Sequence, residues 1–286
     1  MKLITWNVQW CRGVDGKVDA ARVVAEAKRL ADFDVLCLQE IGDNFPDPRL
    51  PGHSGEDQFA RLGALLPGYT AVPGIAVDHP GDDGGRRRRF GNMILSRFPV
   101  QQTFAHLLPF PADPGVPGMP RIAIEAVVTA PFGDVRVITT HLEYYGRARR
   151  TAQVEALRAI YAEGAAHACD PSPTKDDGGP FESLPRPAAT IITGDFNLEY
   201  PDPLHARMVA PFADATPPLA DAWDVAHPGE PYPPTFRIYE KEHPDQAAYA
   251  CDFVFVSDGL RPRLRSVVVD TVTQISDHQP VIVTLE

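Results

Sequence analysis

The chain has 286 residues, of which 44% are hydrophobic, and its formal net charge is −11. A chain of this length and composition can bury a large core, and we expect a single domain over residues 1–286. The acidic balance argues against a broad basic surface that tracks a nucleic-acid backbone, although a divalent cation and a local basic loop could still serve a nuclease.

The chain shows no targeting or membrane-spanning pattern. It enters a strand-like sequence without an apolar leader, and no apolar run approaches the ~20 residues of a membrane span. The cysteines (Cys11, Cys37, Cys169 and Cys251) lack C-x-x-C spacing, and we interpret them as free thiols. We therefore expect a soluble, cytoplasmic and monomeric protein.

The first third of the chain alternates apolar strands with helices. Strands are predicted over residues 3–8, 35–40 and 90–96, where short apolar runs stop at polar residues. Helices are predicted over residues 58–66 and over residues 19–30, where apolar residues recur at helical spacing. Such helices would pack on a layer of strands.

Long loops interrupt this pattern. Residues 42–58 and 109–120 are rich in glycine and proline, and the loop 78–89 carries the run Arg86–Arg89. The arginines either grip phosphate as a flap or belong to a solvated loop, and we favour the solvated loop. We expect the loops 78–89 and 109–120, together with residues 231–237, to frame a pocket.

The middle of the chain predicts a hairpin, a helix and an insertion. Residues 121–128 and 135–140 would pair through the turn at 131–134. Residues 147–163 show helical spacing of apolar side chains, and residues 170–187 are a poorly patterned insertion.

The most informative segment is Thr190–Glu199. Its β-branched run predicts a buried strand, and Gly194 and Asp195 then turn the chain at its end. On an extended segment Asp195 and Asn197, two residues apart, would point to the same side and could address one phosphate or one water. The alternative is an ordinary Asx-turn, which Gly-Asp and Asp-x-Asn also favour.

The last third predicts further strands. Residues 201–234 are proline-rich and only partly helical, whereas residues 252–256, 264–270 and 281–285 are apolar and strand-like. A polar turn over residues 275–280 precedes the last strand.

A polar residue recurs where a strand ends. Strands outnumber helices without regular βαβ alternation, so we infer two packed sheets flanked by a few helices, with the polar termini gathered at one end. Three carboxylates, two carboxamides and two histidines form an oxygen-rich cluster that suits Mg²⁺ or Mn²⁺ better than zinc. These residues are Glu40, Asp195, Asp277, Asn7, Asn197, His141 and His278.

Seven motifs resemble, in order and approximate spacing, those of the endonuclease/exonuclease/phosphatase superfamily. They are Trp6-Asn7, Gln39-Glu40, Gly91-Asn92, Thr140-His141-Leu142, Gly194-Asp195-Phe196-Asn197, Asp252 and Ser276-Asp277-His278. The resemblance covers the chain from end to end. It implies an α/β (α+β) four-layer α/β/β/α sandwich, with two mixed β-sheets flanked by helices, and Mg²⁺-dependent hydrolysis of phosphoesters, with phosphodiesters favoured.

The resemblance also assigns roles at the metal and at the nucleophile. Glu40 would be the principal metal ligand, with Asn7 and Asp277 close to the cation. Asp195 would orient and deprotonate the attacking water. Whether one or two metal ions take part stays open.

The remaining matches would contact the phosphoryl group and the rest of the substrate. His278 would stabilise developing charge, with Asp252 fixing its tautomer and orientation. Asn197 would hold a phosphate oxygen or position the nucleophile, and His141 would contact a non-bridging oxygen. Weaker matches to substrate-binding positions are Asn92, which could instead only cap a turn, Arg121 and Arg150.

The substrate stays open, because in this superfamily the loops choose it. The candidates are nucleic acid, a nucleotide or a small phosphoester, including a phospholipid headgroup. Tyr144 and Tyr145 do not clearly match the tyrosine expected of abasic-site endonucleases, which weakens a DNA-repair role. A catalytically silent phosphate-binding or nucleic-acid-binding module on the same fold is the alternative hypothesis, and it would predict decay of the acid and histidine positions.

Overall fold

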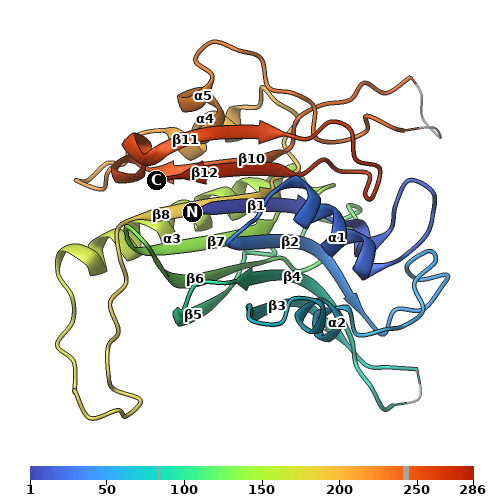
Figure 1. Ribbon diagram of the computed structural model, residues 1–286, viewed down its shortest axis with the longest axis horizontal. Helices are drawn as coiled ribbons and strands as arrows, with labels where there is room; N and C mark the ends of the chain where they lie inside the picture. The colour runs from blue at the N-terminus through green and yellow to red at the C-terminus, as the bar shows by residue number, and fades with distance from the viewer. Residues whose placement is uncertain (83, 241–244) are drawn as a thin grey trace.

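The computed structural model describes residues 1–82, 84–240 and 245–286 (Figure 1). Two mixed six-stranded sheets pack face to face, and helices cover their outer faces. This arrangement is the α/β/β/α sandwich expected from the sequence.

The first sheet is built from both ends of the chain. Its central pair, β1 and β2, is parallel, and β1 also pairs antiparallel with the last strand of the chain. The strands follow the order β11 (Leu264–Val269), β12 (Val281–Leu285), β1 (Lys2–Asn7), β2 (Val35–Asp43), β4 (Arg88–Ser96) and β3 (Thr70–His79).

The second sheet is built from the middle of the chain. Its central pair, β7 and β8, is parallel, and β10 runs antiparallel to β8. The strands follow the order β5 (Val100–Leu107), β6 (Ile122–Ala130), β7 (Gly133–His141), β8 (Thr190–Asp195), β10 (Asp252–Ser257) and β9 (Leu219–Asp221).

Alternation of side chains along the strands explains the layers. In β1, Leu3 packs between the two sheets, whereas Ile4 and Trp6 face the helices α1 (Ala20–Leu30) and α2 (Gln58–Leu65). Because successive side chains of a strand point to opposite faces, a strand that is apolar throughout serves both layers. The long helix α3 (Arg147–Cys169) covers the second sheet in the same way.

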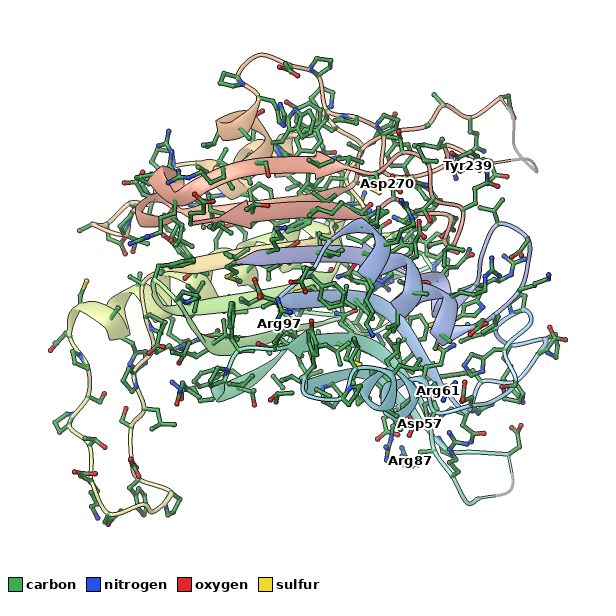
Figure 2. All side chains as sticks on the ribbon, in the orientation of Figure 1. Asp57, Arg61, Arg87, Arg97, Tyr239 and Asp270 are labelled. Atoms are coloured by element: carbon green, nitrogen blue, oxygen red, sulfur yellow. The ribbon has the colours of Figure 1, made fainter. Side chains whose placement is uncertain are left out.

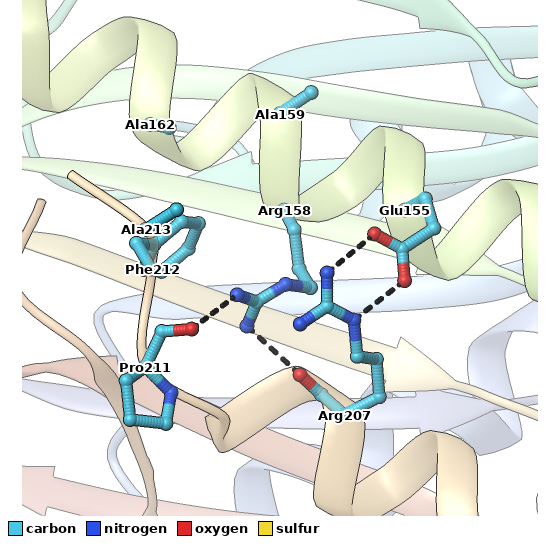
Figure 3. A pocket seen from close by; sticks show the side chains of 8 residues that line it. All are labelled: Glu155, Arg158, Ala159, Ala162, Arg207, Pro211, Phe212 and Ala213. Carbon is cyan, nitrogen blue, oxygen red and sulfur yellow. Dashed lines mark hydrogen bonds and ion pairs between the residues drawn. The ribbon is translucent and has the colours of Figure 1, made fainter.

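A buried arginine ties α3 to the short helix α4 (Pro203–Val209) (Figure 3). Arg158 donates hydrogen bonds to the carbonyl oxygens of Arg207 at 2.8 Å and Pro211 at 3.2 Å, and its guanidinium stacks 4.0 Å from the ring centroid of Phe212. The exposed Arg207 pairs with Glu155 across the same hollow. These polar groups bond to one another and to the backbone, so the contacts around this hollow serve to attach α4 to α3.

A second buried network anchors the segment 170–189, which extends from the end of α3 on the left of Figure 1. Glu125 on β6 is fully buried and accepts hydrogen bonds from Arg136 at 2.7 and 3.1 Å and from Arg186 at 2.9 Å. Arg186 also pairs with Glu163 of α3. The end of this segment is thereby fixed to the second sheet.

Several elements differ from the sequence expectation. Strands β3 and β5 were not predicted, and β3 and β4 extend into the loop predicted over residues 78–89. Helix α3 continues to Cys169 rather than stopping at residue 163, and half of residues 164–169 are alanine, which favours a helix. The proline-rich region 201–234 contains α4, β9 and the short helix α5 (Ala222–Ala226).

The cysteines are free thiols, as expected; three are buried and Cys169 is exposed. Within the described residues, no helix is long and apolar enough to cross a bilayer.

Candidate active site

The predicted polar strand ends meet at one edge of the sandwich. Because β1 and β2 are parallel, Asn7, the last residue of β1, lies opposite Gln39 of β2, next to Glu40. Strand β2 does not end at residue 40 as predicted but continues to Asp43. The parallel pair β7 and β8 likewise ends with His141 opposite Asp195. Antiparallel β10 starts at the same edge, with Asp252 opposite Asp195. Both sheets therefore deliver their terminal side chains to one place.

Asn7 joins the two sheets across this edge. Its Nδ2 donates to Glu40 Oε1 at 3.0 Å and to Asp195 Oδ2 at 2.9 Å, while its Oδ1 accepts from the backbone N–H of Gln9 at 3.0 Å. Below it, Gln39 Nε2 donates to Thr139 Oγ1 of the second sheet at 2.9 Å. Asn7 thus orients both carboxylates in this geometry.

Glu40 occupies a strained backbone position. Its φ is 62°, and the pairing of β2 with β4 shifts register between Leu38 and Ile41. This irregularity turns the side chain toward the site edge, as bulges beside functional sites commonly do. Burial, together with the negative charges of Asp277 and Asp195, raises the pKa of Glu40 to about 7. A bound cation would oppose that rise, because it favours the ionised carboxylate.

Asp277 lines the same pocket as Glu40, and its charge acts on the Glu40 carboxyl. Its Oδ2 accepts a hydrogen bond from Gln9 Nε2 at 2.7 Å, and burial raises the pKa of its carboxyl. Ser276 fixes this turn, since its hydroxyl donates to the carbonyl oxygen of Asn7 at 2.8 Å. The turn that contains the Ser-Asp-His motif is therefore attached directly to β1.

His278 and Asp252 form a buried pair. His278 Nδ1 lies 2.9 Å from Asp252 Oδ2, and the same oxygen accepts from Thr235 Oγ1 at 2.6 Å. His278 Nε2 points to Asp195, 3.7 Å from its Oδ2. Burial alone would lower the pKa of His278, but Asp252 and Asp195 raise it well above its usual value. Asp252 thus holds a cationic imidazole with Nε2 aimed at the site.

The turn after β8 places Asp195 and Asn197 by a different geometry from the one expected. Strand β8 ends at Asp195, and Asn197 has a φ of 50°, so the two side chains do not alternate along an extended segment. The backbone N–H of Asn197 donates to Asp195 Oδ1 at 2.9 Å, and its Nδ2 donates to the carbonyl of Leu142 at 2.9 Å. The Asx-turn alternative was correct, and it nevertheless brings both residues to the pocket.

Gly194 allows the close strand pairing beneath this turn. Its φ is 137°, and a Cβ there would lie 1.9 Å from the carbonyl oxygen of Thr140. Glycine is therefore required next to the carboxylate for a steric reason.

His141 is a neutral base at the floor of the site. Its Nε2 lies 3.4 Å from Asp195 Oδ2 and 3.9 Å from Glu40 Oε1. Burial and the positive charge of Arg121 lower the pKa of His141 to about 3. A neutral imidazole can either donate a hydrogen bond to a phosphoryl oxygen or ligate a cation.

Most of these side chains line one pocket of about 300 Å³, whereas Asn7 and Asp252 lie behind its lining and orient residues that form it. Arg121 forms part of its floor at 5% exposure, and its Nε and Nη1 are buried without a hydrogen-bond partner. The full lining is Glu40, Phe90, Met119, Arg121, His141, Tyr144, Tyr145, Asp195, Asn197, Phe236, Asp277 and His278. A buried, unpaired guanidinium beside carboxylates suits an anionic ligand.

Only two of the three expected loops line this pocket. Met119 comes from the loop 109–120, and Phe236, whose ring stacks 4.4 Å from that of His278, comes from residues 231–237. Among the described residues of the loop 78–89, none lines the pocket. Figure 2 shows Arg87 of that loop at the lower right of the molecule.

Two of the weaker substrate-binding candidates have other contacts. Asn92 donates to the carbonyl of Ile122 at 3.0 Å, bridging the two sheets without lining the main pocket. Arg150 donates to the carbonyl oxygens of Glu143 at 2.7 Å and Tyr144 at 2.8 Å, and so fixes the loop after β7. Arg121 is the one of the three that lines the pocket.

The pocket also contains residues that the sequence did not assign. Tyr144 and Tyr145 follow the Thr-His-Leu motif after Glu143, and this adjacency was the available signal for them. Phe236 lies in the segment 231–237 that was expected to frame the pocket, but the residue itself was not assigned. Exposure at a pocket mouth cannot be inferred from spacing alone.

Within the part of the chain that the structure describes, two groups of side chains have ligand atoms close enough together to hold a cation. Ligand atoms of Glu40, His141 and Asp195 lie within 4.8 Å of one another, as do those of Asp195, Cys251 and His278. Burial raises the pKa of the Cys251 thiol well above its usual value, so this thiol stays protonated and is a poor ligand. The group around Glu40 is rich in oxygen and suits a hard divalent cation.

A family model described as "Endonuclease/Exonuclease/phosphatase family" matches residues 4–278. The chain belongs to this family. Family members are phosphoester hydrolases, generally dependent on a divalent metal, and the chain is a hydrolase of this class. A comparison with curated protein sequences found no match.

Solved structures share the fold over the whole chain. The endonuclease/exonuclease/phosphatase from Beutenbergia cavernae is 26% identical with a TM-score of 0.69, and the match covers 100% of this chain and 71% of that one. The mannosyl-6-phosphatase Bt3783 of Bacteroides thetaiotaomicron is 18% identical (TM-score 0.62; 100% and 99% covered). The 3′ phosphatase NExo from Neisseria, bound to a product DNA hairpin, is 18% identical (TM-score 0.61; 100% and 99% covered). These names span sugar phosphates and DNA, so the fold alone does not choose the substrate.

Proposed function

We propose that this protein is a Mg²⁺-dependent phosphodiesterase, with Mn²⁺ as an alternative cofactor. The observation that supports this proposal is the convergence of Glu40 and Asp195, from different sheets, on the amide of Asn7. With Asp277 they form a cluster of carboxylates whose raised pKa values at Glu40 and Asp277 call for a positive charge.

The donor set fits a hard cation. Glu40 and Asp277 would hold it, with Asn7 beside them, and when bound it would neutralise phosphate oxygens and polarise the phosphorus. This chain's own residues would supply the remaining chemistry, and a cytoplasmic, monomeric protein is part of the same proposal.

Asp195 is the proposed general base for the attacking water. Hydrogen bonds from Asn7 Nδ2 and the Asn197 backbone fix both of its oxygens, so the carboxylate is held in one orientation. A base fixed within hydrogen-bond reach of water accelerates its attack by about 10²–10⁴-fold.

Three side chains would stabilise charge on the phosphoryl group. His278 presents its Nε2 as a cationic donor because Asp252 holds the opposite ring nitrogen. Neutral His141 and the unpaired guanidinium of Arg121 face the same pocket. Donors fixed before the reaction stabilise developing charge without reorganisation.

The proposal is tested by hydrolysis of bis(4-nitrophenyl) phosphate with Mg²⁺, with Mn²⁺ and with EDTA. We expect metal-dependent turnover that falls about 10²–10⁴-fold in Asp195→Asn. The matched control is Asp221→Asn, since Asp221 is also buried but lies outside the pocket. A catalytically silent module would show no turnover, and equal turnover in wild type and Asp195→Asn would contradict the assigned base.

A second assay addresses the substrate class. Incision of duplex DNA carrying one abasic site, by wild type but not by Asp195→Asn, would indicate a nuclease. Hydrolysis of the simple diester without incision would instead direct the search to nucleotides and other small phosphodiesters.

A further inference from the structure

Two exposed tyrosines stand at the mouth of the active-site pocket. Tyr144 is 40% exposed and Tyr145 61% exposed, and their rings meet edge to face with centroids 4.9 Å apart. Met119 and Phe236 line the same pocket. Large aromatic side chains gathered beside a pocket are characteristic of ligand contact.

The backbone that carries these rings is fixed from below. Arg150 holds the carbonyl oxygens of Glu143 and Tyr144, and Glu143 Oε1 accepts from the backbone N–H of Tyr145 at 3.0 Å. The hydroxyl of Tyr144 accepts from Arg237 Nη2 at 3.4 Å, across the pocket mouth. The two tyrosine rings are therefore preorganised, which lowers the entropic cost when a ligand binds to them.

Depth separates the tyrosines from the phosphate-handling groups. Asp195, His141 and Arg121 are 1%, 6% and 5% exposed, and they form the floor of the pocket. In an aryl phosphate, the aromatic ring is bonded to the ester oxygen of the phosphate and would lie near that floor. A ring separated from the phosphate by a sugar would instead reach the mouth, where Tyr144 and Tyr145 are.

The surrounding charges favour a small substrate over a long duplex. Three of the four arginines of the run Arg86–Arg89 are engaged locally: Arg86 pairs with Asp43, Arg87 with Asp78, and Arg88 with an acidic residue of its own loop. With a net charge of −11, little basic surface is left to track a duplex backbone.

We propose that the pocket takes a nucleoside phosphoester whose unstacked base packs on Tyr145, with Tyr144 fixing that ring edge to face. The inference rests on the proposed function for the position of the phosphate and adds the class of the group attached to it. An aromatic side chain stacked on one base contributes about tenfold or more in affinity.

Equilibrium binding tests the inference without requiring turnover. In Asp195→Asn protein with Mg²⁺, thymidine 5′-phosphate is compared with 1,2-dideoxyribose 5-phosphate, in which a hydrogen atom replaces the base. We expect the nucleotide to bind about tenfold tighter, and this ratio to fall toward one in Tyr145→Leu but to persist in Tyr145→Phe. Phe181→Leu is the matched control, since Phe181 is 73% exposed on the segment at the opposite end of the sandwich.

Equal binding of the two ligands, no binding of the nucleotide at millimolar concentration, or an unchanged ratio in Tyr145→Leu would overturn the inference. A preference for phenyl phosphate over methyl phosphate, without a preference for thymidine, would also overturn it in favour of an aryl ester. Cleavage of the dinucleotide TpT, compared with its analogues lacking either base, then shows which base is held. Absence of all hydrolysis, with the binding preference intact, would count against the proposed function alone.

Discussion

The Asp252→Asn substitution tests the histidine pair most sharply. Thr235 at 2.6 Å and His278 at 2.9 Å approach Asp252 Oδ2, and the thiol of Cys251 donates to the same oxygen at 3.5 Å, while Asp252 Oδ1 is buried without a partner. An asparagine has the same shape but no charge. Its oxygen can accept these bonds only if its NH₂ group takes the unpartnered position, where it has no acceptor.

The expected loss follows from these contacts. A hydrogen bond to a charged group contributes about 1.5–3 kcal/mol, and a neutral amide forfeits most of that stabilisation of the imidazolium. Because about 1.4 kcal/mol corresponds to a tenfold change in rate, kcat should fall about 10–100-fold. The loss should be smaller than that of Asp195→Asn, which removes the proposed base itself.

The assay is steady-state hydrolysis of bis(4-nitrophenyl) phosphate at saturating Mg²⁺, with thermal unfolding of each variant measured alongside. The chain offers a matched control in Asp221, whose Oδ2 lies 2.6 Å from His205 Nε2 in a buried pair outside the pocket. Asp221→Asn should cost comparable stability while kcat stays within about twofold of wild type. A kcat for Asp252→Asn that equals that of Asp221→Asn would refute the reasoning.

The remaining predictions concern stability. Glu125→Leu should lower the free energy of unfolding by about 3–5 kcal/mol, or the melting temperature by about 5–8 °C, because it removes the buried carboxylate that Arg136 and Arg186 share; a change below 1 kcal/mol in urea unfolding would contradict it. Although burial alone would raise the pKa of Glu125, hydrogen bonds from His106, Arg186 and Arg136 lower it below its usual range. The stability that Glu125 contributes is therefore complete above about pH 4.3 and is lost as the pH falls below that value. Between pH 3 and 6, the free energy of unfolding should consequently depend less on pH in the leucine variant than in wild type. Arg158→Lys should cost about 1.5–3 kcal/mol by thermal unfolding, because lysine cannot reach the same carbonyl oxygens and stack on a ring, whereas exposed Arg207→Lys should cost less than 1 kcal/mol.

The sequence predicted the layers better than the sheet edges. Apolar runs such as residues 35–40 and 190–195 lie in sheet centres, where burial on both faces makes the pattern continuous. Strands β3 and β5 were missed, and both lie at sheet edges. In β5, exposed and half-buried residues alternate and several are polar, so it lacks a continuous apolar run. Pro73 and Gly74 within β3 weakened its strand pattern.

Most of the candidate site could be located from sequence because its side chains follow strand ends. Parallel pairing brings such ends together, which is why Asn7, Glu40, His141 and Asp195 meet. Orientation could not be predicted in the same way. Asn197 reaches the pocket through a left-handed turn rather than strand alternation. These details depend on φ values and contacts across loops, which spacing does not encode.

The bonds from Asn7 to Asp195 and from Gln39 to Thr139 span the boundary between the two sheets. The apolar contacts of that boundary are non-directional and would tolerate a slide of one sheet over the other. The polar links would not, since hydrogen bonds weaken steeply when their geometry changes. Neither half of the chain holds a complete set of acids and histidines, so catalytic competence should arise only in the final docking of the sheets. The rate at which activity recovers during refolding would then report the rate of that docking step.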